Sequence, residues 1–448
     1  MKSTVPPVLR LVISLFISLF LIGSGPSLAA QAPVSLAERA IVRAVNAGNA
    51  EGLTLLERVV NINSGTMNLA GVRQVGDVFR AELDGLGFTT RWEDGAPYQR
   101  AGHLIAERTG QGPRLLLIGH LDTVFEPDSP FQRFERLDSA HARGPGVTDM
   151  KGGDVIIVQA LKALKAAGVL DRISITVVLH GDEEHPGEPM GLARRTLIDA
   201  ARTAAIAIGF EDGDGDPRTA VGARRGVTSW HLVTTGTPAH SSQVFREDVG
   251  AGAIYEAARV LNGFRERLAG DPLVTFNPGA AVGGTAVTLD REQARGTAFG
   301  KTNVVAERME VSGDLRTISP EALARAKTVM QTIASESLPR TTATLTFDDG
   351  YPPMAPTEGN RKLLGQYDQV SRDLGFGPVG MDNPAKAGAA DISFAAGIVP
   401  RAMDGLGLGG RDGHTVNETA DLTTLPMITA RTAVLLYRLA QSPMPPTP

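Results

Sequence analysis

Apolar and polar residues follow two different patterns along the chain, and each pattern predicts one kind of secondary-structure element. Over residues 70–87, apolar side chains such as Val75, Val78 and Phe79 recur at steps of three and four, the period of an amphipathic helix. The run ISITVVLH at 173–180 is continuous and rich in β-branched residues, which predicts a buried strand. The same reasoning predicts helices over 35–62, 151–167 and 191–200, and strands over 103–108, 114–119 and 204–210.

The order of these elements predicts the fold class and the domains. Strands alternate with helices through residues 33–225, which is typical of an α/β fold whose mixed, largely parallel sheet has helices on both faces. From residue 226 to residue 350 the order becomes βαββαβ, that of a small two-layer domain. We therefore expect an inserted domain over 226–350, called the inserted segment below. Residues 351–442 are expected to complete the first domain, which would carry the catalytic site.

Within the inserted segment, one helix has a clear start signal. Ser319 is suited to cap a helix, and Pro320 to occupy its first turn. The other elements expected in this segment are a helix over 248–268 and strands over 226–236, 283–290, 303–316 and 341–347.

The first 30 residues have the pattern of a cleaved secretory signal. Lys2 and Arg10 precede an apolar run over 11–22, and small residues follow at 27–32, where Ala29, Ala30 and Ala32 are candidate cleavage positions. The run is short for a membrane span, although an uncleaved anchor is the alternative interpretation. We expect a secreted, periplasmic protein that has no membrane segment after cleavage and that ends in a disordered tail at 443–448.

The amino-acid composition excludes several classes of function and of metal site. The chain has 448 residues, with 44 Lys and Arg against 49 Asp and Glu, and this mild acidity argues against a nucleic-acid-binding protein. Cysteine is absent, so there is no disulfide framework, no thiolate nucleophile and no Cys-ligated zinc. Any metal must be held by His, Asp and Glu.

Possible metal ligands stand at the ends of three predicted strands. His120 follows the strand at 114–119, the pair Glu183 and Glu184 follows the strand at 173–180, and Glu211 follows the strand at 204–210. In an open parallel sheet, ligands bind outside the carboxyl ends of the strands, so these side chains should converge.

Two further residues complete a pair of metal sites. Asp149 lies just before a predicted helix, and His414 lies in a glycine-rich loop. Imidazole and carboxylate ligands suit zinc, and also cobalt or manganese. We expect Asp149 to bridge two metal ions. His120 and Glu211 would hold one ion, and Glu184 and His414 the other.

Two acidic residues remain for supporting and catalytic roles. Asp122, two residues after His120, can accept the second N–H of its imidazole and fix the ring's orientation. Glu183, next to a ligand, is the natural general base, which would take a proton from water and pass it to the leaving amine.

Five ordered motifs resemble those of the M20 family of metallopeptidases, above all its glutamate carboxypeptidase (carboxypeptidase G2-like) group. The motifs are GHLDTV, GVTDMKGG, GDEE, GFED and GGRDGHTVNE. The resemblance covers essentially the whole chain after the signal. It implies a two-zinc amidohydrolase with the ligands, base and supporting Asp assigned above.

The resemblance also assigns roles within the inserted segment. It implies a lid that dimerises and supplies His240 to the active site of the partner subunit, where it would stabilise the oxyanion. Asn303 belongs to a second lid motif, and Arg316 in the sequence Asp-Leu-Arg would grip a substrate carboxylate. A surface turn at His240 and an ion pair at Arg316 are the alternative interpretations.

Three functions are weighed on these grounds. The first is a secreted peptidase that removes a C-terminal amino acid, with a glutamate-like residue as one option, or cleaves an N-acyl amino acid. The second is an aminopeptidase or dipeptidase of the same family. The third is a non-catalytic binding protein on the same fold, which the presence of every ligand and of the base argues against.

Overall fold

The structure is a computed structural model that describes residues 34–291, 293 and 295–442. The predicted signal at 1–30 and the predicted tail at 443–448 lie outside the described residues. Within the described ranges, no helix combines the length and the apolar character needed to cross a membrane.

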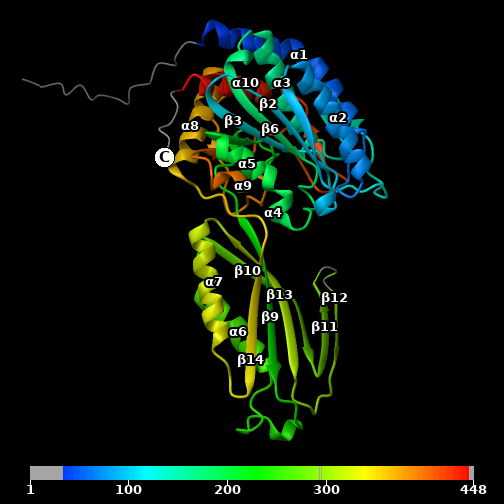
Figure 1. Ribbon diagram of the computed structural model, residues 1–448, viewed down its shortest axis with the longest axis vertical. Coiled ribbons are helices and arrows are strands. Elements are labelled where there is room, and N and C mark those ends of the chain that lie inside the picture. The colour runs from blue at the N-terminus through cyan, green and yellow to red at the C-terminus, as the bar shows by residue number, and fades with distance from the viewer. Residues whose placement is uncertain (1–33, 292, 294, 443–448) are drawn as a thin grey trace, which may run out of the picture. The chain divides into compact units, whose positions relative to one another are not determined.

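A six-stranded sheet forms the centre of the main part, in the order β1-β2-β6-β3-β7-β16. Figure 1 labels three of its strands, β2, β6 and β3. Strands β6, β3, β7 and β16 run parallel to one another. At one edge, β2 pairs antiparallel with β6, and β1 pairs antiparallel with β2. The strands cover Thr89–Asp94 (β1), Gly102–Arg108 (β2), Gln111–His120 (β3), Ile173–His180 (β6), Ile206–Gly209 (β7) and Ala402–Met403 (β16).

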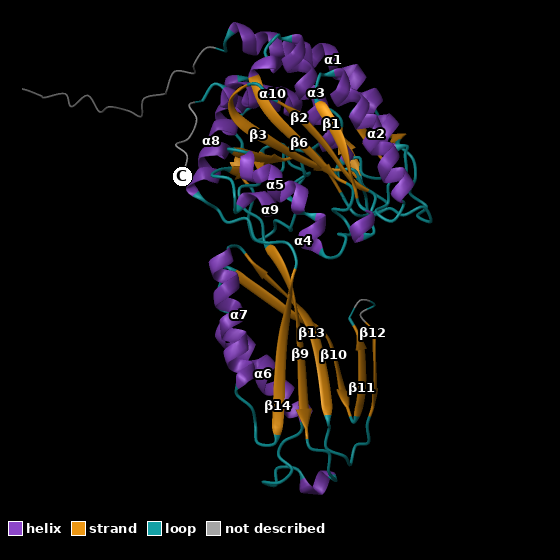
Figure 2. Ribbon diagram, in the orientation of Figure 1, coloured by secondary structure: helices purple, strands orange, loops and turns teal. Residues whose placement is uncertain are grey.

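Helices cover both faces of this sheet, as Figure 2 shows. On β3, Leu115 and Leu117 belong to a core shared with α1, α2, α3 and α10, whereas Leu116 and Ile118 belong to a second core with α5 and α9. Because a strand buried on both faces must be apolar throughout, the continuous run RLLLIG is explained. The predicted α/β fold class is confirmed. The helices are Leu36–Val60 (α1), Leu69–Gly85 (α2), Lys151–Ala166 (α3), Arg195–Thr203 (α5), Ile392–Ala396 (α9) and Thr424–Ala440 (α10).

A smaller sheet joins distant parts of the chain, in the order β17-β18-β5-β4. It pairs the segment after the glycine-rich loop with the segment before Asp149, so both segments are held side by side. Its strands are Glu135–Arg136 (β4), His141–Arg143 (β5), Gly410–Arg411 (β17) and Thr419–Asp421 (β18). The remaining elements of the main part are Thr219–Ala220 (β8), Gly380–Met381 (β15), Met190–Ala193 (α4), Glu358–Asp373 (α8), and the short 3-10 helices Ala96–Tyr98 (η1) and Leu170–Arg172 (η2).

The inserted segment forms an antiparallel sheet in the order β10-β13-β9-β14, and α6 and α7 pack on it around Trp230 and Phe264. Ser319 caps α7 as predicted, because its Oγ accepts a hydrogen bond from the Ala322 N–H at 3.2 Å. The elements are Gly226–Gly236 (β9), Ser241–Gln243 (η3), Ala253–Leu268 (α6), Val274–Gly284 (β10), Ala286–Asp290 (β11), Arg295–Phe299 (β12), Arg308–Thr317 (β13), Pro320–Ser335 (α7) and Thr341–Asp349 (β14).

Two strand predictions in this segment are wrong in their bounds. Instead of one strand over 283–290, β10 ends at Gly284, and β11 then pairs with β12 as a hairpin. β10 contains Pro278, which is tolerated there because β10 is an edge strand with an irregularity between Pro278 and Ala280. The strand expected over 303–316 begins only at Arg308.

Candidate active site and metal centre

The parallel register of three strands brings the predicted ligands to one edge of the sheet. His120 at the end of β3 lies opposite His180 at the end of β6, and the loop carrying Glu183 and Glu184 follows directly. On the other side of β3, β7 ends at Gly209, and Glu211 follows two residues later. The strand order β6-β3-β7 therefore converts three distant positions in the sequence into neighbours.

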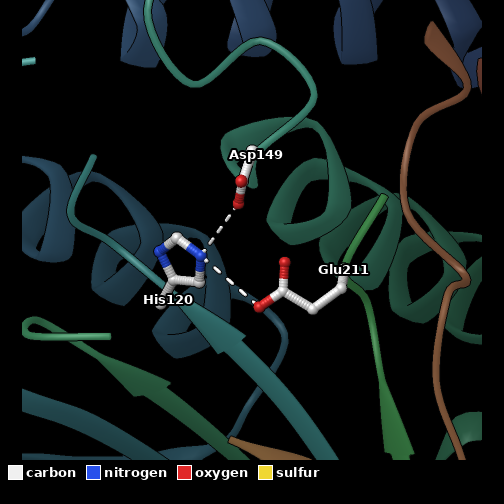
Figure 3. Close-up of side chains that lie close together, drawn as sticks. All are labelled: His120, Asp149 and Glu211. Carbon is white, nitrogen blue, oxygen red and sulfur yellow. Dashed lines mark hydrogen bonds and ion pairs between the residues drawn. The ribbon is translucent and has the colours of Figure 1, made fainter. Parts of the chain in front are cut away.

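Asp149 lies between two groups of ligands and directs one carboxylate oxygen at each. Its Oδ1 is 3.2 Å from His120 Nε2, which also lies 3.5 Å from Glu211 Oε1 (Figure 3). Its Oδ2 is 2.8 Å from His414 Nε2, which lies 3.1 Å from Glu184 Oε2. Within each group the candidate ligand atoms lie within 4.8 Å of one another. The structure thus brings together all five residues that the sequence predicts as ligands.

The character of these side chains fits a pair of divalent cations. Each group combines one imidazole with two carboxylates, a donor set that zinc, cobalt and manganese accept. Glu184 Oε1 is buried and has no hydrogen-bond partner among the residues that the structure describes, so this oxygen is available to a cation. Burial raises the pKa of Glu211 well above its usual value despite the opposing effect of His120, and Asp149 raises it further. Cations would offset the crowding of these carboxylates.

Asp122 connects the His120 strand to the loop of the two glutamates. Its carboxylate is fully buried and accepts hydrogen bonds from the backbone N–H groups of Glu183 at 3.0 Å and Glu184 at 3.1 Å, and from the Thr66 hydroxyl at 2.6 Å. His120 Nδ1 lies 3.1 Å from the Asp122 carbonyl oxygen and 3.4 Å from its carboxylate. Asp122 therefore holds the ring and the loop in one arrangement.

Glu183 has the environment of a proton-transfer group. Burial raises the pKa of its carboxyl well above the ordinary value, and the nearby carboxylate of Asp391 raises it further. An acid–base catalyst works best when its pKa lies near the operating pH, so a raised pKa suits a glutamate in this role. Its backbone is fixed from both sides, because its N–H donates to Asp122 and its carbonyl accepts from the Tyr351 hydroxyl at 2.9 Å.

Comparison with known proteins identifies the family. The model of peptidase family M20/M25/M40 matches residues 116–438, which is most of the chain. The chain belongs to this family. The resemblance that the five motifs suggested is confirmed.

Three known proteins are similar to this chain over most of its length. Carboxypeptidase G2 from Pseudomonas sp. (strain RS-16) is 27% identical over 376 residues, which are 83% of this chain and 85% of that protein. The aminopeptidase PepT from Bacillus cereus has a similar fold, with a TM-score of 0.69, 18% identity, and coverage of 88% of this chain and 99% of that one. The Bacillus subtilis YXEP protein, described as a dinuclear metal-binding peptidase of the M20 family, has a TM-score of 0.60 at 15% identity, with coverage of 88% and 99%.

Next to the loop of Glu183 and Glu184 in this M20 protein lies a buried ionic network that the sequence did not predict. Arg194 is fully buried and pairs with Asp182 and with Asp391, each at 2.7 Å. It also donates to the Tyr351 hydroxyl at 2.8 Å, and Asp391 forms a close contact with His180. The GDEE motif contains Asp182, but Arg194 and Asp391 carry no motif, so only the fold reveals the network.

The three residues predicted to bind substrate lie in the inserted segment of this M20 protein. The structure brings His240 and Asn303 together, because Ser241 N–H donates to the Asn303 carbonyl at 2.9 Å and His240 pairs with Val304 in a β-bridge. His240 itself is exposed, with Nδ1 2.8 Å from the Ser242 hydroxyl. Arg316 is half-buried on β13 and pairs with Asp314 of the same strand at 2.9 Å.

Proposed function

We propose that this M20-family protein is a two-zinc amidohydrolase that cleaves the amide bond next to a free carboxylate. Its substrate would be a small peptide, from which it removes the C-terminal amino acid, or an N-acyl amino acid. One observation supports the proposal most directly: the two carboxylate oxygens of Asp149 face two separate groups of candidate metal ligands. Glu183 lies beside them in the chain, next to the candidate ligand Glu184.

The division of labour follows from the contacts. His120, Asp149 and Glu211 would hold one metal ion, and Glu184 and His414 would share Asp149 to hold the other, with zinc proposed and cobalt or manganese as alternatives. When bound, such ions supply Lewis acidity to amide hydrolysis.

A protein side chain would transfer the proton. Glu183 would accept a proton from the attacking water and deliver it to the leaving amine nitrogen, which cannot depart as an anion at neutral pH. Asp122 fixes the positions of Glu183 and Glu184, because the backbone N–H groups of both glutamates donate to its carboxylate.

Substrate recognition is assigned to the inserted segment. Arg316 Nε donates to Asp314 at 2.9 Å, and the two terminal NH₂ groups of its guanidinium would donate to the free carboxylate of the substrate. His240, with Asn303 in the adjoining turn, would stabilise the developing oxyanion, supplied by the partner subunit of a homodimer. The similarity to carboxypeptidase G2 supports the carboxypeptidase assignment.

We also propose that the protein acts outside the cytoplasm, in the periplasm. The basic start, the apolar run at 11–22 and the small residues at 27–32 support this location.

Peptides blocked at one end test the substrate assignment. The metal-loaded protein should cleave an N-acetyl dipeptide, which keeps its carboxylate, and should spare a dipeptide amide, as followed by mass spectrometry. Arg316→Ala should raise KM for the N-acetyl dipeptide by about 10-fold or more, the loss expected for a charge-assisted hydrogen bond. Preferential cleavage of the dipeptide amide would instead indicate an aminopeptidase. Equal KM values for Arg316→Ala and the parental protein would show that Arg316 does not bind the substrate carboxylate.

A further inference from the structure

Glu418 is a fully buried carboxylate whose hydrogen bonds all reach the loop that carries Asp149. Its Oε1 accepts from the Thr148 N–H at 2.8 Å, the Thr148 hydroxyl at 3.0 Å and the Asp149 N–H at 3.1 Å. Its Oε2 accepts from the Gly146 N–H at 3.0 Å. Backbone N–H groups that converge on one anion hold it firmly, so this contact fixes the path of residues 146–149.

The same residue ends the loop that carries His414. Glu418 lies four positions after His414, and its backbone N–H donates to the Thr415 carbonyl at 3.0 Å. One side chain therefore joins the loop of the shared carboxylate Asp149 to the loop of the histidine. Across this junction, Asp149 Oδ2 and His414 Nε2 are 2.8 Å apart.

His414 depends on its loop for its position. Its side chain is 58% exposed, so packing restrains it little, whereas the Glu184 side chain is 5% exposed. Both His414 and Asp412 have positive φ angles, 62° and 61°, in the left-handed region that residues other than glycine seldom adopt. Such a backbone persists only when neighbouring contacts hold it. In this loop the Asp412 carbonyl accepts from the Thr415 N–H at 3.2 Å and from the Thr415 hydroxyl at 2.8 Å, and the Thr415 carbonyl accepts from the Glu418 N–H at 3.0 Å. The four hydrogen bonds of the Glu418 carboxylate then join the end of this loop to residues 146–149.

We propose that Glu418 is a positioning residue for the metal site formed by Asp149, Glu184 and His414. It keeps the loops 146–149 and 410–418 together, so that Asp149 and His414 stay within reach of a common cation. Glu418 itself contacts neither substrate nor metal in this role. The inference rests on the proposed metal-dependent function.

Metal binding by Glu418→Gln tests this role without reference to catalysis. Glutamine keeps the shape of the side chain but turns one acceptor oxygen into an NH₂ group that must face an N–H donor of the loop. Zinc content after dialysis, measured by mass spectrometry, should fall from two ions towards one per chain. In a calorimetric titration with Co²⁺, the affinity of the weakened site should fall by about 10- to 100-fold, as is usual when a residue that orients a ligand is lost.

A matched variant controls for the loss of a buried carboxylate. Glu256 in the inserted segment is also fully buried and accepts from the Leu338 N–H at 2.9 Å and the Thr341 hydroxyl at 3.1 Å. Glu256→Gln should lower thermal stability and leave both metal affinities unchanged. Two ions bound with parental affinity by Glu418→Gln would overturn the proposal.

A double-mutant cycle distinguishes positioning from general support of the fold. In the His414→Ala background the affected site has already lost its histidine, so adding Glu418→Gln should reduce metal affinity little further. Fully additive losses would overturn the proposal.

A milder variant serves if Glu418→Gln does not fold. Thr148→Val removes only the hydroxyl contact at 3.0 Å and should weaken the same site by a smaller factor. If Glu418→Gln does not fold and a folded Thr148→Val protein binds metal with unchanged affinity, Glu418 supports only the fold, and the proposal is overturned.

The proposed function can fail separately. If the parental protein binds two ions but cleaves neither blocked dipeptide, the proposed function is contradicted, and the effect of Glu418→Gln on metal binding can still be interpreted.

Discussion

At the scale of single residues, the chemistry depends on which atom of each side chain faces which neighbour. Glu183 and Glu184 are adjacent in the chain, yet Glu184 Oε2 lies 3.1 Å from His414, whereas Glu183 has a carboxyl whose pKa burial raises. Their backbone N–H groups both donate to Asp122. In the proposed mechanism, this one loop has two tasks, because Glu184 would bind a metal ion and Glu183 would transfer the proton.

Replacing Glu183 by glutamine separates these tasks. Glutamine cannot carry a proton to the leaving amine, so kcat should fall by about 100- to 10,000-fold, the range expected for loss of a general acid–base group. Metal content should stay at the parental value, because the ligands are intact. Steady-state kinetics on an N-acyl amino acid, with metal analysis of the same sample, provide the measurement. Parental turnover in this variant would refute the assignment.

At the scale of elements, a few buried side chains hold the loop of Glu183 and Glu184 against the sheet. Arg194, at the junction of α4 and α5, joins Asp182 after β6 to Asp391 at the start of α9. A buried ion pair is costly to break, because the partner that remains is left as an uncompensated charge.

Removing Arg194 should therefore destabilise the protein. Arg194→Ala leaves two buried carboxylates without their cation, and we expect a loss of about 3–5 kcal/mol in the free energy of unfolding. Arg194→Lys, which keeps the charge but not the paired geometry, should recover part of this loss. Urea unfolding followed by circular dichroism measures both.

An exposed pair gives the comparison for Arg194. Arg246 and Asp248 pair at 3.0 Å with side chains that are 58% and 64% exposed. Because exposed pairs contribute little to stability, Arg246→Ala should leave the unfolding midpoint nearly unchanged. Equal effects of Arg194→Ala and Arg246→Ala would contradict the role given to the buried network.

At the scale of the whole molecule, metal ions would join parts of the chain that are far apart in sequence. The five predicted ligands span residues 120 to 414, so a cation bound to them is bound only by the folded chain. Ligands that bind only the native state stabilise it by mass action.

Chelation should therefore affect both stability and activity. Removing the metals with EDTA should abolish hydrolysis and lower the melting temperature, since saturation at 100 times Kd contributes about 2.7 kcal/mol. Zn²⁺ or Co²⁺ should restore both properties, whereas Mg²⁺ is a poor match for imidazole-containing sites. Differential scanning fluorimetry and an activity assay on the same samples provide the check. Full activity in EDTA would exclude a metal-dependent mechanism.

The proposed homodimer makes a prediction at the same scale. Ile254 and Tyr255 on α6 are 47% and 57% exposed, and Phe245 packs beside Tyr255 with ring centroids 5.5 Å apart. This apolar surface on the inserted segment is suited to contact a second copy. Ile254→Glu should shift the protein to monomer in light scattering, because a charge would be buried in the contact.

Leu36 supplies the control for this experiment. It is 78% exposed on α1 in the main part, so Leu36→Glu adds the same charge away from the inserted segment. Leu36→Glu should keep the parental mass. A dimer that persists in Ile254→Glu would place the contact elsewhere.

The sequence by itself determined the class of the fold and the identity of the candidate ligands. Continuous apolar runs specify buried parallel strands, and donors that follow such strands must meet at one edge, so His120, Glu184 and Glu211 could be grouped in advance. Only the tertiary structure determined which polar side chains contact distant segments of the chain. Arg194 with Asp391, and Glu418 with the N–H groups of 146–149, are contacts between segments that no local pattern links. Likewise, β10 can include Pro278 within a strand because β10 lies at a sheet edge, a position that only the assembled sheet defines. Periodicity reports which face of an element is buried, whereas the partner of a polar side chain is set by the packing of the whole chain.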